Sequence, residues 1–364
     1  MPDKKIGIVI DIDFALKHQP PFPRPMFVAY ETPNRIKFLM DYFENVQLFE
    51  DERIIKLSPK IIEEKIIELA HSKYYIESIK RLSSYGSSLL DEEVFITSDT
   101  YDLAKKAIGG AISGIENVIN KKVHQSFALI RPPGHHALRD MGSGLSIFNN
   151  IATSILYLRK ELNYNKKIAI IDIDAHFGDG LVQYFYSDPS VLYFSVHEYD
   201  FVEGELGFPD ELGEGDGLGK NINFPIPYGI NDNEFLEIFD ILQPLIKEFE
   251  PDLILVAAGF DMYFADPVGN CNLTTYAYYT FTERILKLAE EVCEGKLSFI
   301  LEGGYSLIGF PFCIHSVIKA LLNEKYVRPS FENICLFNES RMEEIINIKN
   351  SLITLLKGYW KLEK

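Results

Sequence analysis

The stretch "KIAIIDIDAHFGDG", residues 167–180, places polar side chains at every second position of an apolar run and then turns into glycines. Because residues i, i+2 and i+4 of a strand point to one face, Asp172, Asp174 and His176 are predicted to share a face. Burying these charges costs several kcal/mol each unless a partner or a metal compensates. The stretch therefore predicts a buried strand that carries a ligand-binding site at its end.

The composition is that of an ordinary soluble globular protein. The chain has 364 residues, of which 47% are hydrophobic and 24% are charged, enough for one large or two medium domains. No apolar run approaches the roughly 18 residues of a membrane span. The opening "MPDKKIGIVIDIDF" is predicted to be a first strand rather than a signal peptide, because Asp11 and Asp13 interrupt its apolar part. We expect no membrane partner and a cytoplasmic location.

Cysteine usage and charge narrow the class further. The four cysteines are widely spaced and form no CxxC pair, so we predict reduced core thiols at Cys271, Cys293, Cys313 and Cys335. The formal net charge of −17 argues against direct binding of nucleic acid and favours a cationic ligand.

Short β-rich apolar runs alternate with longer helical patterns, which predicts βαβ units around a mostly parallel sheet. The predicted strands are 5–11, 126–131, 167–174, 190–197, 252–259 and 297–304, and the predicted helices include 100–120, 149–162 and 231–250. No repeat or linker divides the chain. We therefore expect one α/β domain over 1–364, with an amphipathic helix at about 342–362 packing on it.

Polar residues cluster after four of these strands, and the carboxyl ends of strands are where open α/β sheets bind ligands. The segments are RPPGHHA (131–137), AHFGDG (175–180), FDMYFADP (260–267) and EGGY (302–305). Asp174, His176 and Asp261 form a set that suits zinc or ferrous iron with open positions for water and substrate. Taken alone, Asp261 is equally compatible with a helix N-cap or a turn. Together the strand ends predict one composite metal site.

Seven sequence blocks carry a family resemblance. They are ETPNR (31–35), RPPGHHA (131–137), GLSIFNN (144–150), DIDAHFGDG (172–180), SVH (195–197), AAGFD with ADP (257–267) and EGGY (302–305). In these blocks the chain resembles a prokaryotic-type member of the histone deacetylase and acetylpolyamine amidohydrolase superfamily. The resemblance implies an arginase-like fold, with an eight-stranded, mostly parallel sheet flanked by helices. It also implies a zinc-dependent deacetylase, a hydrolase that removes an acetyl group from acetyl-lysine or an acetylated polyamine.

The resemblance extends to individual site residues. The metal ligands it implies are Asp174, His176 and Asp261, and the catalytic set is His135, His136, Asp172, Asp179 and Tyr305. The two aspartates of the catalytic set match the carboxylates that hydrogen-bond the histidine pair. Amide hydrolysis needs a polarised carbonyl, an activated water and a proton for the leaving amine. We assign proton transfer to His136, positioning to His135, and binding of the oxyanion to the hydroxyl of Tyr305.

Further residues are implied around the substrate and around a second ion. Gly144, Leu145 and Phe208 match the substrate tunnel, and Arg35 matches an arginine of an internal acetate-release channel. A structural K⁺ or Na⁺ site is implied at Asp172, Asp174, His176, Ser195 and Val196.

Three positions depart from the usual family pattern. Phe177 replaces a common second histidine, which changes hydrogen bonding behind the metal site. Ser146 replaces a usual cysteine, and Leu145 replaces an aromatic wall of the tunnel. A tunnel of Leu and Phe binds the methylenes of a substrate less specifically than two rings do. The sequence therefore does not decide between acetyl and longer acyl groups as the group removed.

The loop at 198–216 carries eight acidic residues and no Lys or Arg. It is either a solvated glycine-rich loop or a surface that attracts a cationic acetylated small molecule or an acetyl-lysine protein. The segment between 70–79 and the helix at 100–120 is short and lacks the long insertion of polyamine-specific relatives, which favours a general deacetylase. The sequence leaves the oligomeric state open.

Two other functions stand beside the deacetylase. A ureohydrolase with two manganese ions needs a carboxylate two residues after His176, where this chain has Gly178. A catalytically silent binder of acetylated ligands is expected to have lost a metal ligand, a catalytic histidine or the tyrosine, and all of these are present.

Overall fold

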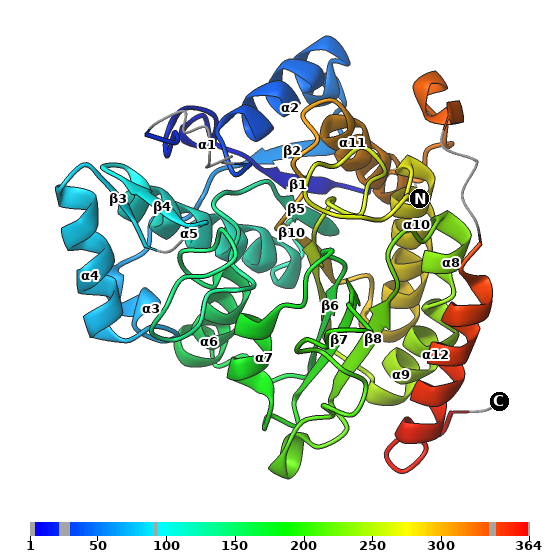
Figure 1. The fold of residues 1–364 in the computed structure, drawn as a ribbon. Coiled ribbons are helices and arrows are strands. Elements are labelled where there is room, and N and C mark those ends of the chain that lie inside the picture. Colours follow the sequence, from blue (N-terminus) through cyan, green and yellow to red (C-terminus); the bar gives the residue numbers. More distant parts are fainter. Residues whose placement is uncertain (1–3, 22–29, 91–92, 335–339, 363–364) are drawn as a thin grey trace. The chain divides into compact units, whose positions relative to one another are not determined.

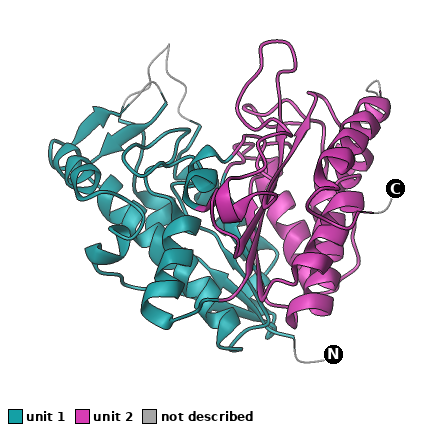
Figure 2. Cartoon of the chain, turned by 90° about the horizontal axis from the view of Figure 1, so that it is seen from below, with its two compact units in different colours: residues 1–165, 178–184, 298–302 teal, residues 166–177, 185–297, 303–364 magenta. Residues whose placement is uncertain are grey.

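The computed structural model describes residues 4–21, 30–90, 93–334 and 340–362 (Figure 1). The chain forms two compact units (Figure 2). Unit 1 comprises the residues up to 165 together with 178–184 and 298–302, and unit 2 comprises 166–177, 185–297 and the residues from 303 onward. The single domain expected for 1–364 stays a prediction.

Unit 1 begins at the N-terminal strand and contains the first part of the fold. Its elements are β1 (Ile6–Val9), α1 (Asp13–Leu16), α2 (Asn34–Asn45), η1 (Leu48–Glu50), β2 (Ile54–Leu57), α3 (Glu64–Ile67), α4 (Lys73–Ser84), β3 (Ser87–Leu89), β4 (Phe95–Thr97), α5 (Thr100–Ile119), β5 (Gln125–Ala128) and α6 (Asn150–Leu162). All but the last residue of α7 (Asp179–Phe185) and all but the first of β10 (Leu297–Leu301) also belong to it.

Unit 2 contains the remaining strands and the C-terminal helices. Its elements are β6 (Ile168–Asp172), β7 (Val191–Glu198), η2 (Gly215–Gly217), β8 (Asn221–Ile226), α8 (Asp232–Leu236), α9 (Phe239–Phe249), β9 (Leu253–Ala258), α10 (Thr275–Cys293), α11 (Gly309–Leu321), η3 (Ser330–Ile334) and α12 (Met342–Leu356).

Eight strands form the main sheet, as predicted. The strand order is β2-β1-β5-β10 in unit 1 and β9-β6-β7-β8 in unit 2. The registers of β1 with β2 and β5, and of β6 with β7 and β9, are all parallel. Residues of β6 and β9 are buried throughout, which is typical of parallel strands covered on both faces. Helix α5 packs on β1 and β5, while α10 contacts β9 and α12 contacts β8.

Sequence patterns missed the two edge strands of this order, β2 and β8. Edge strands are often short or polar because they present one unpaired side. Strand β2 has only four residues, and β8 alternates Asn221 and Asn223 with apolar residues and contains Pro225. An edge position tolerates such a proline, because the missing N–H is not needed by a further strand.

Two predicted boundaries are wrong in an instructive way. The strand expected over 167–174 ends at Asp172, because the side chain of Asp172 accepts a hydrogen bond from the N–H of Asp174 and turns the chain. Asp174 and His176 therefore lie in the following loop rather than on a strand face. The helix expected over 231–250 is two helices, α8 and α9, and its junction at Ile238 uses tighter i to i+3 bonds.

The predicted C-terminal helix is confirmed as α12, although it ends earlier than expected. It buries Ile345, Leu352 and Leu356, and beyond it Nε1 of Trp360 donates to the carbonyl of Gly219 at 2.7 Å. Among the described cysteines, Cys271, Cys293 and Cys313 are buried free thiols, as predicted, whereas Cys335 lies outside the described residues. No helix of the described residues has the length and apolarity needed to cross a bilayer.

Candidate metal centre and its neighbours

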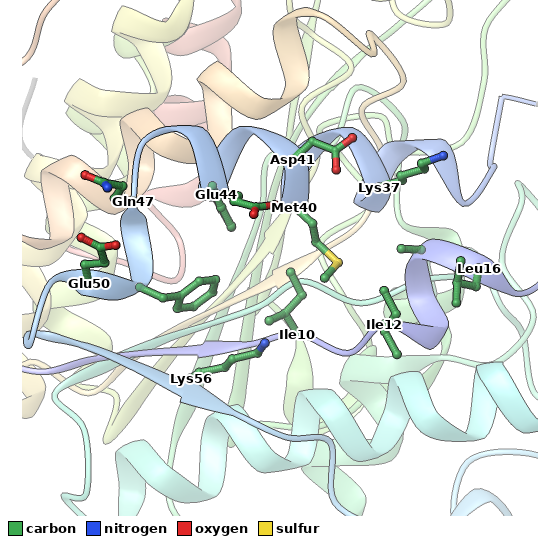
Figure 3. A pocket seen from close by; sticks show the side chains of 13 residues that line it. Ile10, Ile12, Leu16, Lys37, Met40, Asp41, Glu44, Gln47, Glu50 and Lys56 are labelled. Carbon is green, nitrogen blue, oxygen red and sulfur yellow. The ribbon is translucent and has the colours of Figure 1, made fainter.

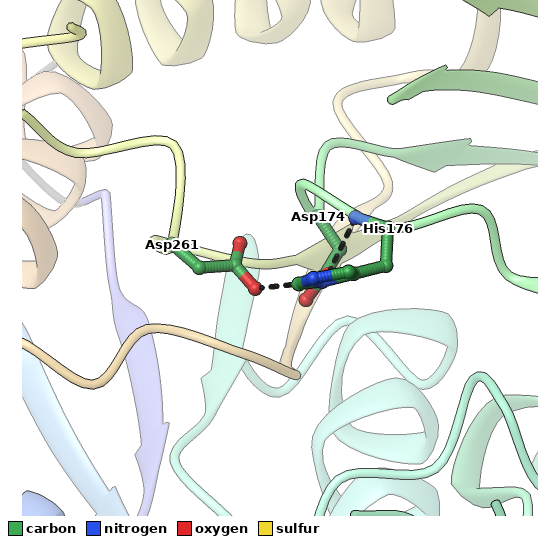
Figure 4. Close-up of side chains that lie close together, drawn as sticks. All are labelled: Asp174, His176 and Asp261. Carbon is green, nitrogen blue, oxygen red and sulfur yellow. Dashed lines mark hydrogen bonds and ion pairs between the residues drawn. The ribbon is translucent and has the colours of Figure 1, made fainter. Parts of the chain in front are cut away.

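Unit 2 brings Asp174, His176 and Asp261 together at the carboxyl ends of two neighbouring strands, β6 and β9 (Figure 4). One donor atom from each residue lies within 4.8 Å of the others. Nδ1 of His176 is 3.0 Å from Oδ1 of Asp174 and 3.3 Å from Oδ2 of Asp261. A zinc ion with bonds of about 2.0–2.1 Å keeps tetrahedral ligands about 3.3 Å apart. The three predicted ligands therefore have the spacing of a metal centre.

The surroundings leave the donor atoms facing one another. The other carboxylate oxygens are used by the backbone, because Ala175 N–H donates to Oδ1 of Asp261 and Gly303 N–H donates to Oδ2 of Asp174. Oδ2 of Asp261 is buried and accepts no aligned hydrogen bond from the described residues. A Cβ at Gly303 would lie 2.3 Å from that oxygen. The residues present therefore fit a bound cation.

The electrostatics of this centre also favour a cation. Burial, followed by the negative charge of Asp174, raises the pKa of Asp261 to about 7. Burial opposes the charged form of His176, but the nearby carboxylates of Asp174 and Asp261 together outweigh it and raise the pKa of the imidazole well above its ordinary value. Two carboxylates share one imidazole, so a divalent ion would replace the proton that now holds them together.

The residues predicted for a monovalent ion also lie in unit 2. Asp172 on β6 is in register with Ser195 on β7, and Val196 follows Ser195 on that strand. The carboxylate of Asp172 accepts hydrogen bonds from the hydroxyl of Tyr193 at 3.0 Å and from the N–H of Asp174 at 3.1 Å. The K⁺ or Na⁺ site stays a prediction.

Unit 1 contains the tandem histidines and one of their predicted carboxylates. The rings of His135 and His136 lie 4.0 Å apart, and Nδ1 of His136 is 2.8 Å from Oδ1 of Asp179. Because a carboxylate only accepts, Nδ1 of His136 carries the proton in its hydrogen bond to Asp179. The predicted bond between His135 and Asp172 stays a prediction.

Gly144 and Leu145 lie on the loop beside this histidine pair. A Cβ at Gly144 would lie 2.3 Å from the ring of His136, so only glycine fits there. Gly144 and Leu145 have φ values of 48° and 64°. A left-handed backbone is costly for leucine, which indicates that the loop is held firmly against His136. Ser146 is buried, and its hydroxyl faces the carbonyl of Gly144 at 3.4 Å.

The backbone of Tyr305 is anchored in unit 2 by a carboxylate that the sequence patterns did not assign. Oδ2 of Asp266 accepts hydrogen bonds from the N–H groups of Tyr305 and Ser306 at 2.5 and 2.8 Å. Gly304 has φ of 107°, and a Cβ there would lie 2.7 Å from the side chain of Phe260. The turn into Tyr305 therefore requires glycine at position 304.

Phe208 presents a half-exposed ring on a backbone that is bonded at both ends. Oε1 of Glu211 accepts from the N–H of Phe208 at 3.1 Å, and Nδ2 of Asn223 donates to its carbonyl at 3.0 Å. The preceding carbonyl, that of Gly207, accepts from Nε2 of His197 at 3.0 Å. The structure therefore holds Phe208 rigidly while leaving its side chain accessible.

Phe177, which replaces a common second histidine of the family, lies against His197. The Phe177 ring packs 4.9 Å from the His197 ring. Burial lowers the pKa of His197 to about 3, so the ring is neutral. Since Nε2–H donates to a carbonyl, Nδ1 accepts from the hydroxyl of Ser195 at 2.8 Å. Both ring nitrogens of His197 are therefore used in hydrogen bonds within the fold.

Arg35 is buried in unit 1 and bonded to the end of strand β10. Its Nη2 donates to the carbonyl of Glu302 at 2.6 Å, and its Nη1 lies 3.5 Å from Oε1 of Glu31. Its predicted role in an acetate-release channel stays a prediction.

A separate hollow of about 560 Å³ lies in unit 1 against α2, β1 and β2 (Figure 3). Its apolar lining residues are Ile10, Ile12, Ala15, Leu16, Met40, Phe43 and Phe49, and its polar ones are Lys37, Asp41, Glu44, Gln47, Glu50 and Lys56. None of the predicted site residues is among these described lining residues.

Sequence reasoning missed the carboxylates and amides that hold the site from behind: Asp266, Glu211, Asn223 and Glu302. Two of them lie inside blocks that were recognised, ADP and EGGY. The available signal was an acidic residue directly beside glycines or proline at a strand end, and it does not reveal which backbone N–H groups the acid binds.

Comparison with known proteins finds a matching protein family and similar sequences. A family model described as "Histone deacetylase domain" matches residues 29–321. A probable deacetylase of Archaeoglobus fulgidus is 36% identical over 318 residues, which cover 86% of this chain and 86% of that protein.

Two eukaryotic relatives are longer. Histone deacetylase 18 of Arabidopsis thaliana is 33% identical over 98% of this chain and 52% of its own length. Polyamine deacetylase HDAC10 of Danio rerio is 33% identical over 82% of this chain and 44% of its own length. The chain thus spans about half the length of these relatives. The crystal structure of the HDA15 HD domain matches with a TM-score of 0.82 and 26% identity, over 98% of each chain.

Proposed function

Because the chain belongs to the histone deacetylase family, we propose that it hydrolyses the amide of an acetylated amine, with acetyl-lysine or an acetylated polyamine as substrate. The observation that carries the proposal is the donor set of Asp174, His176 and Asp261, whose spacing suits a single divalent ion. Zinc is the proposed ion and ferrous iron the alternative, since both accept nitrogen and oxygen ligands with open positions.

A divalent ion in this centre would supply Lewis acidity toward the carbonyl oxygen and the attacking water. The chain's own residues then move the protons. Asp179 holds the Nδ1 proton of His136, which leaves Nε2 to take a proton from water and to deliver it to the departing amine. We assign donation of a hydrogen bond to the developing oxyanion to the hydroxyl of Tyr305.

A family model described as a histone deacetylase domain matches residues 29–321 as one stretch. We propose on this basis that 1–364 acts as one catalytic domain.

The acidic loop at 198–216 supports a cationic substrate. Its eight acidic residues and absence of Lys or Arg create a negative surface. The rings of Phe201 and Phe208 both pack on Tyr199, at 4.9 and 5.6 Å, and both are partly exposed. Aromatic rings beside carboxylates suit an ammonium group, so we propose that this loop receives the charged part of the acetylated substrate.

The test compares acetate release by zinc-loaded protein from an acetyl-lysine peptide and from an N-acetylated polyamine. Tyr305→Phe is expected to lower kcat about 10²–10³-fold, the usual loss for one oxyanion donor. Tyr74→Phe is the matched control, because Tyr74 is 80% exposed on α4, and its activity should equal wild type. Peptides with longer acyl groups in the same assay test whether Leu145 widens the tunnel.

The outcomes separate the alternatives. Release that collapses in Tyr305→Phe supports the deacetylase, and the faster substrate identifies the preferred amine. No release from any acylated substrate, with one metal bound per chain, would refute hydrolysis and favour a silent binder of acetylated ligands.

A further inference from the structure

Glu302 is a fully buried carboxylate at the end of β10 that belongs to neither the metal ligands nor the catalytic set. Its Oε2 accepts hydrogen bonds from two consecutive backbone N–H groups, those of Gly134 at 2.6 Å and His135 at 3.1 Å. Its own carbonyl accepts from Nη2 of Arg35 at 2.6 Å. All of these residues lie within unit 1.

A carboxylate is an expensive group to bury, whereas an apolar side chain of similar size is not. Glu302 must therefore contribute something that an apolar residue cannot. What it contacts is the peptide that carries the tandem histidines, through the N–H groups of Gly134 and His135. Hydrogen bonds to an ionised acceptor are shorter and stronger than neutral ones, so this peptide is fixed in one orientation.

The rest of the histidine loop is held by Asn149 and Asn150 at the start of helix α6. Nδ2 of Asn150 donates to the carbonyl of Pro132, and Nδ2 of Asn149 donates to the carbonyl of Ala137, both at 3.1 Å. A Cβ at Gly134 would lie 2.5 Å from the backbone nitrogen of Asn150. The loop is thus clamped between α6 and Glu302, and Glu302 supplies the only charged group among these described contacts.

The residue after Glu302 acts on the metal ligands. Gly303 N–H donates to Oδ2 of Asp174 at 2.8 Å within unit 2. Two successive residues therefore hold the two halves of the proposed machinery: Glu302 holds the histidine loop and Gly303 holds a metal ligand. Neighbours outside the ligand set commonly orient the groups that perform the chemistry.

We propose that Glu302 is a positioning residue. Its carboxylate holds the backbone of the tandem histidines in the orientation that proton transfer by His136 requires. This inference rests on the proposed function. Glu302 is not one of the predicted metal ligands or substrate-binding residues, so we expect its replacement to affect the proton-transfer step while substrate binding and metal binding persist.

The test uses Glu302→Gln, which keeps the shape and removes the charge. We expect kcat to fall about 10–100-fold, the usual effect of losing an outer orienting group, with KM and the metal content per chain unchanged. Glu302→Asp, which keeps the charge, should fall between wild type and Glu302→Gln. Glu234→Gln is the matched control, because Glu234 is also fully buried and accepts from the N–H of Arg341, and its kcat should be unchanged.

A second readout does not depend on activity. Hydrogen exchange of the amides of Gly134 and His135, followed by NMR or mass spectrometry of the segment 131–137, should be slow in wild type and faster in Glu302→Gln. Unchanged exchange in Glu302→Gln would overturn the inference, and so would faster exchange with an unchanged kcat in an active enzyme. If wild type releases no acetate at all, the proposed function fails, whereas the exchange of Gly134 still decides whether Glu302 holds the histidine loop.

Discussion

Two clusters of buried charged residues in this molecule are similar in composition but differ in how their charges are paired. In unit 1, Glu31 pairs with Arg131, and both side chains are buried. Nε and Nη2 of Arg131 donate to the two carboxylate oxygens of Glu31 at 2.6 and 2.7 Å, and the remaining donors reach the carbonyls of Phe14, Lys17 and His18. Every charge in this cluster has a partner of opposite sign.

The cluster in unit 2 is built differently. Asp174 and Asp261 share one imidazole and otherwise accept only backbone N–H groups among the described contacts. For Glu31, burial raises the pKa, but the charge and hydrogen bonds of Arg131, together with the charges of His18 and Arg35, outweigh it, and the pKa is lowered. For Asp261, burial and Asp174 act in the same direction, and the pKa is raised to about 7. In the first cluster each charge is paired with an opposite charge, whereas the second has the donor set of a candidate metal site.

The largest expected effect comes from Asp261→Asn. Removing one ligand should lower acetate release by at least about 10³-fold, since the metal provides several kcal/mol of transition-state stabilisation. Without metal, the variant should be at least as stable as wild type, because one of two mutually repelling carboxylates is gone. Metal content, turnover and urea unfolding of the metal-free protein check these points.

Asp41→Asn, at an exposed aspartate of α2, is the control for Asp261→Asn and should change none of these quantities. Retained metal and activity in Asp261→Asn would show that the triad is not the metal centre. A large loss of stability in the metal-free variant would mean that this cluster, like that of Glu31, is a structural one.

Arg131→Met should have the opposite profile. It leaves Glu31 buried without its guanidinium, and breaking a buried pair in this way typically costs about 3–5 kcal/mol. The double variant Glu31→Gln with Arg131→Met should recover part of the loss, because no charge is then stranded. Urea unfolding at pH 7 measures both. If Arg131→Met lowered the unfolding free energy by less than about 1 kcal/mol, the pair would contribute no more than a surface ion pair does. The contrast between the two clusters would then not hold.

The smallest expected effect is a pH dependence from His18, which lies 3.8 Å from Glu31. The pKa of His18 is lowered to about 3, mainly by burial. The charge of Glu31 raises this pKa and the charge of Arg131 lowers it, but both effects are smaller than that of burial. The unfolded chain binds the proton near pH 6.5, so the stabilising contribution is present above that pH and is lost as the pH falls toward 3. The slope is about 1.4 kcal/mol per pH unit.

Comparing wild type with His18→Asn isolates this term. Between pH 6.5 and 5, wild type should lose about 2 kcal/mol more unfolding free energy than the variant. If the unfolding free energies of wild type and His18→Asn changed in parallel with pH, His18 would not be a buried neutral histidine. The Glu31 cluster would then take up a proton at His18 as easily as the unfolded chain does.

Several features of the site were predictable because they are local. Asp174 and His176 are two residues apart, and Asp179 follows three residues later, so any fold that ends a buried strand there brings them to one place. The third ligand, Asp261, follows β9, and its position was predictable because the carboxyl ends of parallel neighbours meet at one edge. The strand limit at Asp172 was not predictable, since a side-chain bond to the next turn overrides apolar alternation.

The sequence by itself determined the alternation of strands and helices, and it indicated which residues could serve as metal ligands and which glycines turn the chain around them. Only the tertiary structure decided which buried acid binds which partner. Glu302 and Gly134 are 168 residues apart, and Glu31 and Arg131 are 100 apart. The physical reason is that every residue offers a backbone N–H, so the choice among them depends on packing. The same carboxyl group is a metal ligand, half of an ion pair or a clamp on a loop according to what the fold places within about 3 Å of it.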